Sequence, residues 1–123
     1  MTYIDGFVLA VPTANKAPFI DMANSMGALF IELGATRLLE CWGDDVPDGT
    51  LTDFRKAVQA KDDEAVVFAW VEWPDKAIRD TAMARMQELA KTDDRFNREM
   101  HPVPFDGKRM IFGGFSPVVT LTK

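Results

Sequence analysis

The amino-acid sequence predicts an α+β fold of the ferredoxin-like type, in which a four-stranded antiparallel sheet carries two helices on one face. Two observations predict it. Segments with strand character and segments with helical spacing follow each other in the order β-α-β-β-α-β. The length of 123 residues fits one domain of about 100–150 residues. We therefore expect a single domain over residues 1–123.

The first strand and the first helix are separated by a change of period. Residues 3–11 form an apolar run that ends at Pro12, which lacks the N–H that a sheet ladder needs. A helix over residues 16–33 is then predicted, with Asn15 as its N-cap and Gly34 after its last turn. Its apolar stripe consists of Phe19, Met22, Met26, Leu29, Phe30 and Leu33.

The middle of the chain is predicted to hold two strands joined by a long connection. A strand at 36–42 leads into the segment 43–63, which has little strand character. Loops longer than about 12–15 residues are uncommon in compact domains. We expect a short helical turn within this one, with Thr52 as its cap and Phe54 on its buried side. The next strand, 65–73, is the most strongly apolar segment of the chain.

The last third of the chain begins with a helix that has a clear start signal. Asp75, directly after Pro74, is the expected N-cap. The buried face of this helix is predicted from the spacing of Ile78, Ala82, Met86 and Leu89. Residues 92–107 are expected to be irregular, with one turn around 95–100. The last strand is predicted from Arg109 to about Leu121, with interruptions at Gly113, Gly114 and Pro117.

Both faces of the predicted sheet are apolar. In the strand 65–73, one face carries Phe68 and Trp70, and the other carries Val71 and Trp73. A sheet that faces water on one side alternates apolar and polar residues instead. Two helices cover only one face, and a large uncovered apolar face marks an association site. The sequence therefore predicts a homodimer through sheet faces. The alternative is that the segment 43–63 folds back over the sheet.

Composition and charge exclude several classes of protein. Nineteen acidic and 14 basic residues give a net charge of −5, which disfavours a nucleic-acid partner because phosphate contacts need clustered Lys and Arg. No stretch approaches the roughly 20 apolar residues of a membrane helix. The N-terminal residues lack the basic start of a signal peptide, and the single Cys41 excludes an intrachain disulfide. We expect a cytoplasmic protein with no membrane partner.

Charged residues inside predicted strands are the best candidates for a functional site, because burying an unpaired charge is costly. Asp5, Glu40 and Arg109 are the catalytic candidates. If their faces point away from the helices, they share a cavity with residues that would bind a ligand. The ligand-binding candidates are Phe7, Trp42, Phe68, Trp70 and Glu72. A carboxyl desolvated in such a cavity has a raised pKa and can act as a general base.

The alternative for the same charges is structural. They would then lie at strand ends or form interface salt bridges, with Arg109 meeting Asp5 or Glu40 across neighbouring strands. Under this interpretation the charged residues bind no ligand.

The remaining residues with chemical potential are expected to be structural. His101 lies in an irregular segment, where an exposed loop histidine is ordinary. Asp44 begins an acidic stretch that fails the calcium-loop template, because Arg55 stands at its twelfth position. Cys41 is expected to be a buried thiol, and the glycines at 113–114 to mark a close approach to a partner subunit rather than to a ligand. No motif predicts a metal or a cofactor.

Four segments carry a resemblance to a known family. They are Tyr3-Ile-Asp-Gly-Phe-Val8, Glu40-Cys-Trp-Gly-Asp-Asp-Val-Pro47, Phe54-Arg-Lys-Ala-Val-Gln-Ala-Lys61 and Phe105-Asp-Gly-Lys-Arg-Met-Ile-Phe-Gly-Gly-Phe115. With them the chain resembles the YbaA-like family of uncharacterised bacterial proteins over nearly its whole length. The resemblance implies a dimeric α/β barrel of two face-to-face ferredoxin-like sheets. That superfamily includes cofactor-free monooxygenases, haem peroxidases, chlorite-dismutase-like enzymes, muconolactone isomerases and proteins of no known activity.

Three hypotheses of function follow. The first is a homodimer that binds a small, partly apolar molecule in a pocket of the barrel. The second is a cofactor-independent monooxygenase or isomerase, with Asp5 or Glu40 as base, Arg109 as oxyanion stabiliser, and Trp42 and Trp70 as walls of the site. The third is a structural or regulatory dimer without a ligand.

Overall fold

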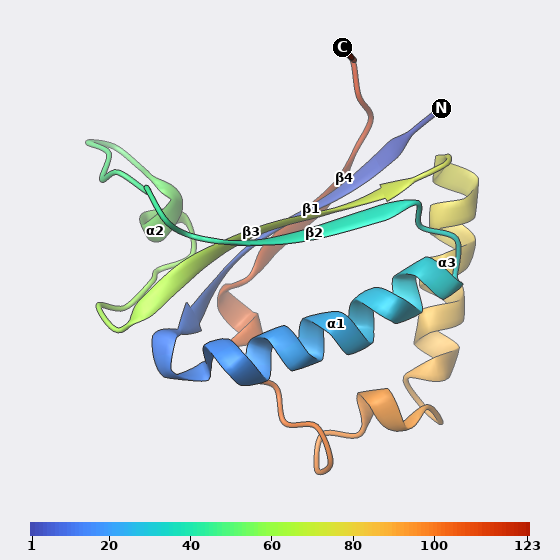
Figure 1. Cartoon of the computed structure of the whole chain (residues 1–123), viewed down its shortest axis with the longest axis horizontal. Helices are drawn as coiled ribbons and strands as arrows, with labels where there is room; N and C mark the ends of the chain where they lie inside the picture. The colour runs from blue at the N-terminus through green and yellow to red at the C-terminus, as the bar shows by residue number, and fades with distance from the viewer.

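Four antiparallel strands form one sheet in the order β2-β3-β1-β4 in the computed structural model, which describes residues 1–123 (Figure 1). The strands are β1 (Tyr3–Pro12), β2 (Arg37–Trp42), β3 (Glu64–Trp73) and β4 (Ile111–Phe115). The long strands β1 and β3 pair in the centre from Tyr3 opposite Trp73 to Pro12 opposite Glu64. Since two helices lie on one side of this sheet, the predicted ferredoxin-like α+β fold is confirmed.

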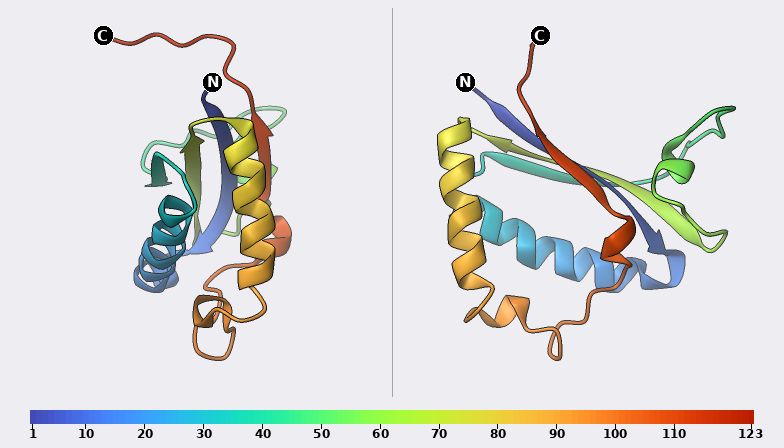
Figure 2. Two further views of the ribbon diagram at one scale, coloured as in Figure 1. Left: turned by 90° about the vertical axis from the view of Figure 1, so that its right-hand side faces the viewer. Right: turned by 180° about the vertical axis from the view of Figure 1, so that it is seen from behind.

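The two long helices cover the same face of the sheet in different ways. Helix α1 (Lys16–Glu32) runs along the sheet, whereas α3 (Lys76–Leu89) stands upright at one end of it (Figures 1 and 2). The short helix α2 (Phe54–Ala57) lies at the other end. Three single turns of 3₁₀-helix complete the structure: η1 (Thr13–Asn15), η2 (Asp94–Phe96) and η3 (Gly107–Arg109). No helix has both the length and the apolar character needed to span a membrane.

The helix starts show which capping predictions were correct. The Asp75 carboxylate accepts the N–H of Ile78 at 2.8 Å, as predicted for the N-cap of α3. Asn15 occupies the N-cap position of α1 without a side-chain cap, because its Nδ2 donates to the carbonyl of Pro104 at 2.9 Å instead. The prediction of Thr52 as the cap of the short helix was wrong. Asp53 caps α2, with its carboxylate accepting the N–H of Lys56 at 2.6 Å.

The last strand is shorter at both ends than the sequence indicated. Arg109 lies in η3, and β4 starts only at Ile111. At the other end β4 stops at Phe115, which faces Ile4 near the start of β1. Beyond that point β1 offers no further partner, and Pro117 cannot donate a backbone hydrogen bond. Residues 116–123 consequently make no backbone hydrogen bond within the chain.

The hydrophobic core lies between the sheet and the two long helices. It comprises one cluster of Leu9, Val11, Phe19, Val67 and Ala69, and a second of Ala35, Val71, Trp73 and Ala82. All the strand residues in these clusters share the face turned toward α1 and α3. On the opposite face, only the end beneath α2 is covered, where Val58 packs on Ala10 and Val66.

Candidate functional site

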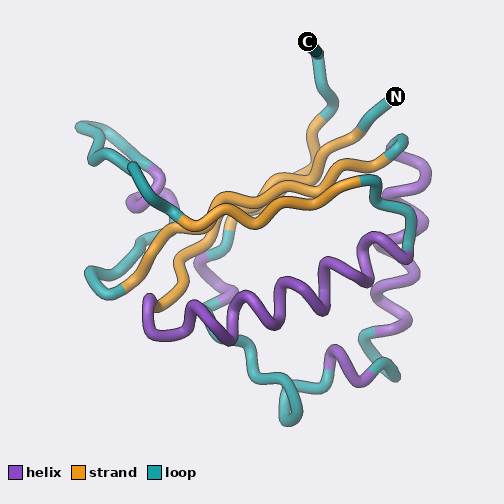
Figure 3. The backbone as a smooth tube through the Cα atoms, viewed as in Figure 1, coloured by secondary structure: helices purple, strands orange, loops and turns teal.

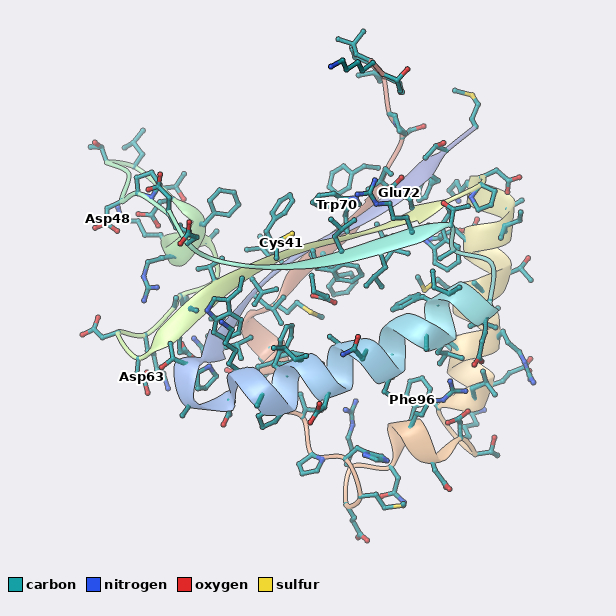
Figure 4. All side chains as sticks on the ribbon, in the orientation of Figure 1. Cys41, Asp48, Asp63, Trp70, Glu72 and Phe96 are labelled. Carbon is teal, nitrogen blue, oxygen red and sulfur yellow. The ribbon has the colours of Figure 1, made fainter.

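The sheet register separates the predicted site residues into two groups. Phe7 and Glu40 both lie opposite Ala69, so they share the face turned toward α1. By the alternation of side chains along each strand, Asp5 and Trp42 belong to that face too. Phe68, Trp70 and Glu72 lie on the other face, and Figure 4 shows Trp70 and Glu72 on the side of the sheet away from α1. The prediction of one cavity containing all of them was therefore wrong.

Asp5 is engaged by its own chain. Its side chain is almost fully buried, and its carboxylate accepts the indole N–H of Trp73 at 2.8 Å and an Arg79 guanidinium N–H at 2.7 Å. A second Arg79 nitrogen, Nε, donates to it at 3.0 Å. These bonds fix α3 to the sheet and satisfy the charge, as buried charges require. Asp5 thus has a structural role, and its ion-pair partner is Arg79 rather than the predicted Arg109.

Arg109 is engaged in the same way at the opposite end of the sheet. Its guanidinium makes two hydrogen bonds to the Glu64 carboxylate, at 2.6 and 2.7 Å, and one to Asp106 at 3.0 Å. The hydrogen bonds from Arg109 to the Glu64 carboxylate lower the pKa of Glu64 to about 2. The alternative that paired Arg109 with Asp5 or Glu40 was therefore wrong. The guanidinium ties η3 to the start of β3, which removes it from the set of groups free to meet a ligand.

Glu40 differs from these paired charges because its carboxylate makes no hydrogen bond or ion pair in the structure. It projects from the edge strand β2 into a groove of about 310 Å³ beside α1, and it also lines a smaller apolar cavity of about 130 Å³ beneath the sheet. The residue keeps an exposed surface at the sheet edge. The crowding of its carboxyl by neighbouring protein atoms nevertheless raises its pKa to about 7, since burial disfavours the charged form.

The rest of this groove, called here the Glu40 groove, is apolar with a few polar groups. It is lined by Lys16, Phe19, Ile20, Ala23, Asn24, Leu38, Glu40 and Trp42. The Lys16 ammonium lies 5.1 Å from the centre of the Trp42 ring, and the Phe19 and Trp42 ring centres are 6.2 Å apart. An aromatic wall, one cation, one amide and one carboxyl form the composition typical of a small-molecule site.

Sequence reasoning named two residues of the Glu40 groove, Glu40 and Trp42, and missed its α1 side. The missing residues nevertheless had a signal. Lys16, Ile20 and Asn24 repeat at intervals of four along α1, on a stripe next to the core. A polar residue at each end of such a stripe marks the border of a buried face, and this stripe meets the sheet at β2.

The open face of the sheet holds the second group of predicted residues. Phe68 and Phe115 keep 43% and 60% of their surfaces exposed. They flank a depression of about 680 Å³ that also includes Trp70 and Glu72. The Trp70 indole N–H donates to Glu72 at 3.0 Å. This face remains largely uncovered, and α2 does not fold back far enough to bury it.

The structure gives no sign of a catalytic or metal-binding role for His101, Cys41 or the paired glycines. His101 is exposed, and no group of three or more His, Cys, Asp or Glu side chains is arranged to hold a metal ion. Cys41 is half-buried on the open face, so the expectation of a buried thiol was wrong. The predicted close approach at the paired glycines exists, but it is to the same chain: a side chain at Gly114 would collide with Tyr3.

Comparisons with known proteins agree with the fold and leave the activity open. A family model described as "Protein of unknown function (DUF1428)" matches residues 2–107. The "Uncharacterized protein YbaA" of Escherichia coli (strain K12) is 49% identical over 119 residues, which cover 97% of this chain and 98% of that protein. The protein of the same name from Shigella flexneri matches equally. The crystal structure of a dimeric ferredoxin-like protein from an uncultured marine organism superposes with a TM-score of 0.55 at 11% identity, covering 99% of this chain and 98% of that one.

Proposed function

The chain belongs to the DUF1428 family of proteins of unknown function, and we propose that it is a cytoplasmic homodimer that binds a small, partly apolar molecule in the Glu40 groove. The two subunits join through the open faces of their sheets. The observation that carries the binding proposal is the Glu40 carboxyl, which lies without a hydrogen-bond or ion-pair partner in a mostly apolar groove. The buried carboxylates of Asp5 and Glu64, in contrast, are paired with Arg79 and Arg109.

The dimer is supported by the surface that the monomer leaves exposed. Phe68, Phe115 and Ile111 together present a contiguous apolar area, and burying such side chains contributes about 1.5–3 kcal/mol each. The structural neighbour from the marine organism is described as dimeric. Two subunits would carry a net charge of 2 × −5 = −10, which makes nucleic acid still less suitable as a partner.

The dimer is tested by sedimentation equilibrium at micromolar concentration. The wild-type protein should have twice the subunit mass of 13.8 kDa. Phe68→Asp places a charge on the open face and should give the monomer mass, because an unpaired charge is costly to bury. Met100→Asp is the control, since Met100 is exposed and lies beside residues of α1, on the side of the molecule away from the open face. A wild-type mass near 13.8 kDa contradicts the proposed dimer.

The polar groups of the groove indicate the chemistry of the ligand. Phe19 and Trp42 offer flat apolar contacts, which suit an aromatic or unsaturated compound. Glu40, with its pKa of about 7, can accept or donate a hydrogen bond at neutral pH. The ammonium of Lys16 attracts an anionic substituent. A small aromatic or unsaturated acid that also carries a hydroxyl or keto group meets all three.

A thermal-shift screen of aromatic and unsaturated hydroxy and keto acids tests the binding site. Compounds that bind the native state and not the unfolded chain raise the midpoint of unfolding, and the rise grows with the ratio of their concentration to their Kd. Glu40→Gln should abolish that shift. Glu99→Gln should keep it, because Glu99 is exposed on a turn and does not line the Glu40 groove. A compound that stabilises the wild type and Glu40→Gln equally would contradict the groove as its site. A screen with no stabilising compound would favour a structural dimer without a ligand.

The second candidate function is proton-transfer catalysis in the same groove. A carboxyl with a pKa of about 7 is suited to remove and return a proton at neutral pH. Moving a proton between two carbons of an unsaturated acid needs no cofactor and would make the protein an isomerase. The same proton removal, with dioxygen as co-substrate, begins a cofactor-independent monooxygenation. Exchange of a bound compound's C–H protons with deuterated water, lost in Glu40→Gln, would distinguish catalysis from binding.

A further inference from the structure

The C-terminal segment has the composition of a strand and lacks a partner. Residues 118–122 read Val-Val-Thr-Leu-Thr, four of them β-branched. They make no backbone hydrogen bond, and Val118, Val119 and Leu121 keep 95%, 73% and 90% of their surfaces exposed. Figure 3 shows this segment leaving the end of β4 and the body of the molecule. An isolated chain gains nothing from presenting three large apolar side chains to water.

The direction of the segment leads toward a partner subunit. It rises from the sheet on the side away from α1, which is the open face (Figures 1 and 2). Ser116 and Pro117 already line the same depression as Phe68 and Trp70, so the segment is continuous with the proposed dimer interface. Stacked sheets lie about 10 Å apart, which about three extended residues span. Val118 would therefore arrive at the level of the second sheet.

The second sheet offers one well-suited free edge. Strand β2 pairs only with β3, so its outer backbone groups have no partner strand. It has six residues, Arg37–Trp42, which matches the five-residue length of 118–122. The other free edge belongs to β4, which contains Gly113 and Gly114, and glycines weaken strand pairing.

We infer that residues 118–122 of each subunit add as a fifth strand to the outer edge of β2 in the partner subunit and form the outer wall of the partner's Glu40 groove. This inference rests on the proposed dimer and goes beyond it. The occupant is a second copy of the chain.

Helix α1 shows the surface that this fifth strand would cover. Ile20, which lines the Glu40 groove, is 46% exposed, and Ile31, three helical turns further on, is 48% exposed. Glu40 and Trp42 project from β2 toward the same side. A strand beyond β2 would shield Ile20 and narrow the open side of the groove. The site in one subunit is then complete only when the partner's C-terminal segment is in place.

A cysteine scan tests the pairing directly, because β2 carries the only cysteine of the chain on its open face. Single cysteines replace Val118, Val119, Thr120 and Leu121, and each variant is oxidised and run on a non-reducing gel. A disulfide needs Cβ atoms about 3.5–4.5 Å apart. In a paired strand, alternate side chains point to opposite faces. Crosslinking to Cys41 should therefore occur at alternate positions and give a product of twice 13.8 kDa.

The same variants in a Cys41→Ser background are the controls, and they should lose the disulfide between position 41 of one subunit and the C-terminal segment of its partner. Equal crosslinking at all four positions, crosslinking at none, or a disulfide within one chain would overturn the inference. Sedimentation of each reduced variant separates the two proposals. A dimer without alternating crosslinks rejects the exchanged strand and keeps the sheet-to-sheet dimer, whereas a monomer rejects both.

Discussion

Two carboxylates on the same face of one sheet have opposite surroundings. Asp5, under the α3 end, receives hydrogen bonds from Trp73 and Arg79. Glu40, beside α1, receives none, and burial raises its pKa to about 7. A charge that the chain itself pairs, such as Asp5, holds two elements together. A carboxyl that the chain leaves unpaired in a mostly apolar groove is free to contact a ligand. The comparison separates an acid with a structural role, Asp5, from the acid that we propose to bind a ligand, Glu40.

Among substitutions that test this comparison, the largest change in the free energy of unfolding is expected at Asp5. Replacing Asp5→Ala leaves the Arg79 guanidinium and the Trp73 indole N–H without their partner inside the protein. Removal of one partner from a buried ion pair costs about 3–5 kcal/mol. Urea unfolding followed by fluorescence should show a loss of that size. A loss below about 1 kcal/mol, typical of surface positions, would mean that Asp5 is not the anchor of α3.

A smaller effect is expected at Glu64, which is paired with Arg109. Glu64→Gln should lower the free energy of unfolding by about 1–3 kcal/mol at pH 7, because it weakens a charge-assisted pair. Folding lowers the pKa of Glu64 to about 2 from the usual 4.5. Its contribution is therefore full above pH 4.5 and is lost as the pH falls toward 2. Unfolding curves between pH 7 and 3 should show the wild type and the variant converging, and a constant difference would contradict this.

The smallest effect is expected at Glu40, because its side chain is exposed at the sheet edge and solvent screens its charge. The effect has the opposite sign. Folding raises the pKa of Glu40 from 4.5 to about 7, so the folded state binds the proton more tightly. The stability of the wild type relative to Glu40→Gln should therefore fall as the pH rises from about 4.5 to about 7. At pH 8 the variant should be slightly more stable than the wild type, and at pH 4 nearly equal to it. A variant that is less stable at pH 8 would show that Glu40 has a structural partner.

The sequence predicted the fold well and the site only in part, for identifiable reasons. The order of strands and helices follows from local periodicity, and the alternation of side chains along strands correctly grouped Glu40 with Trp42 and Phe68 with Trp70. Alternation does not say which face meets the helices, because both faces of β3 are apolar. The predicted cavity therefore merged residues from opposite sides of the sheet.

The other wrong predictions, of the Arg109 partner and of the end of β4, concern features that depend on long-range contacts. The pairing of Arg109 depends on how η3 returns to the start of β3, 45 residues away along the chain. The end of β4 is determined by where β1 begins, although residues 118–122 have strong strand character of their own. The strand predicted as far as Leu121 therefore has the right composition and lacks a partner within the chain.

The most direct test of the unpaired, desolvated state of Glu40 is a pH titration of the side-chain carboxyl carbons by NMR, with the Glu40 signal assigned by comparison with Glu40→Gln. Glu40 should titrate near pH 7, because burial of its carboxyl disfavours the charged form. A Glu40 signal that titrates near 4.5, the ordinary value for a solvated glutamate, would contradict the account of the Glu40 groove.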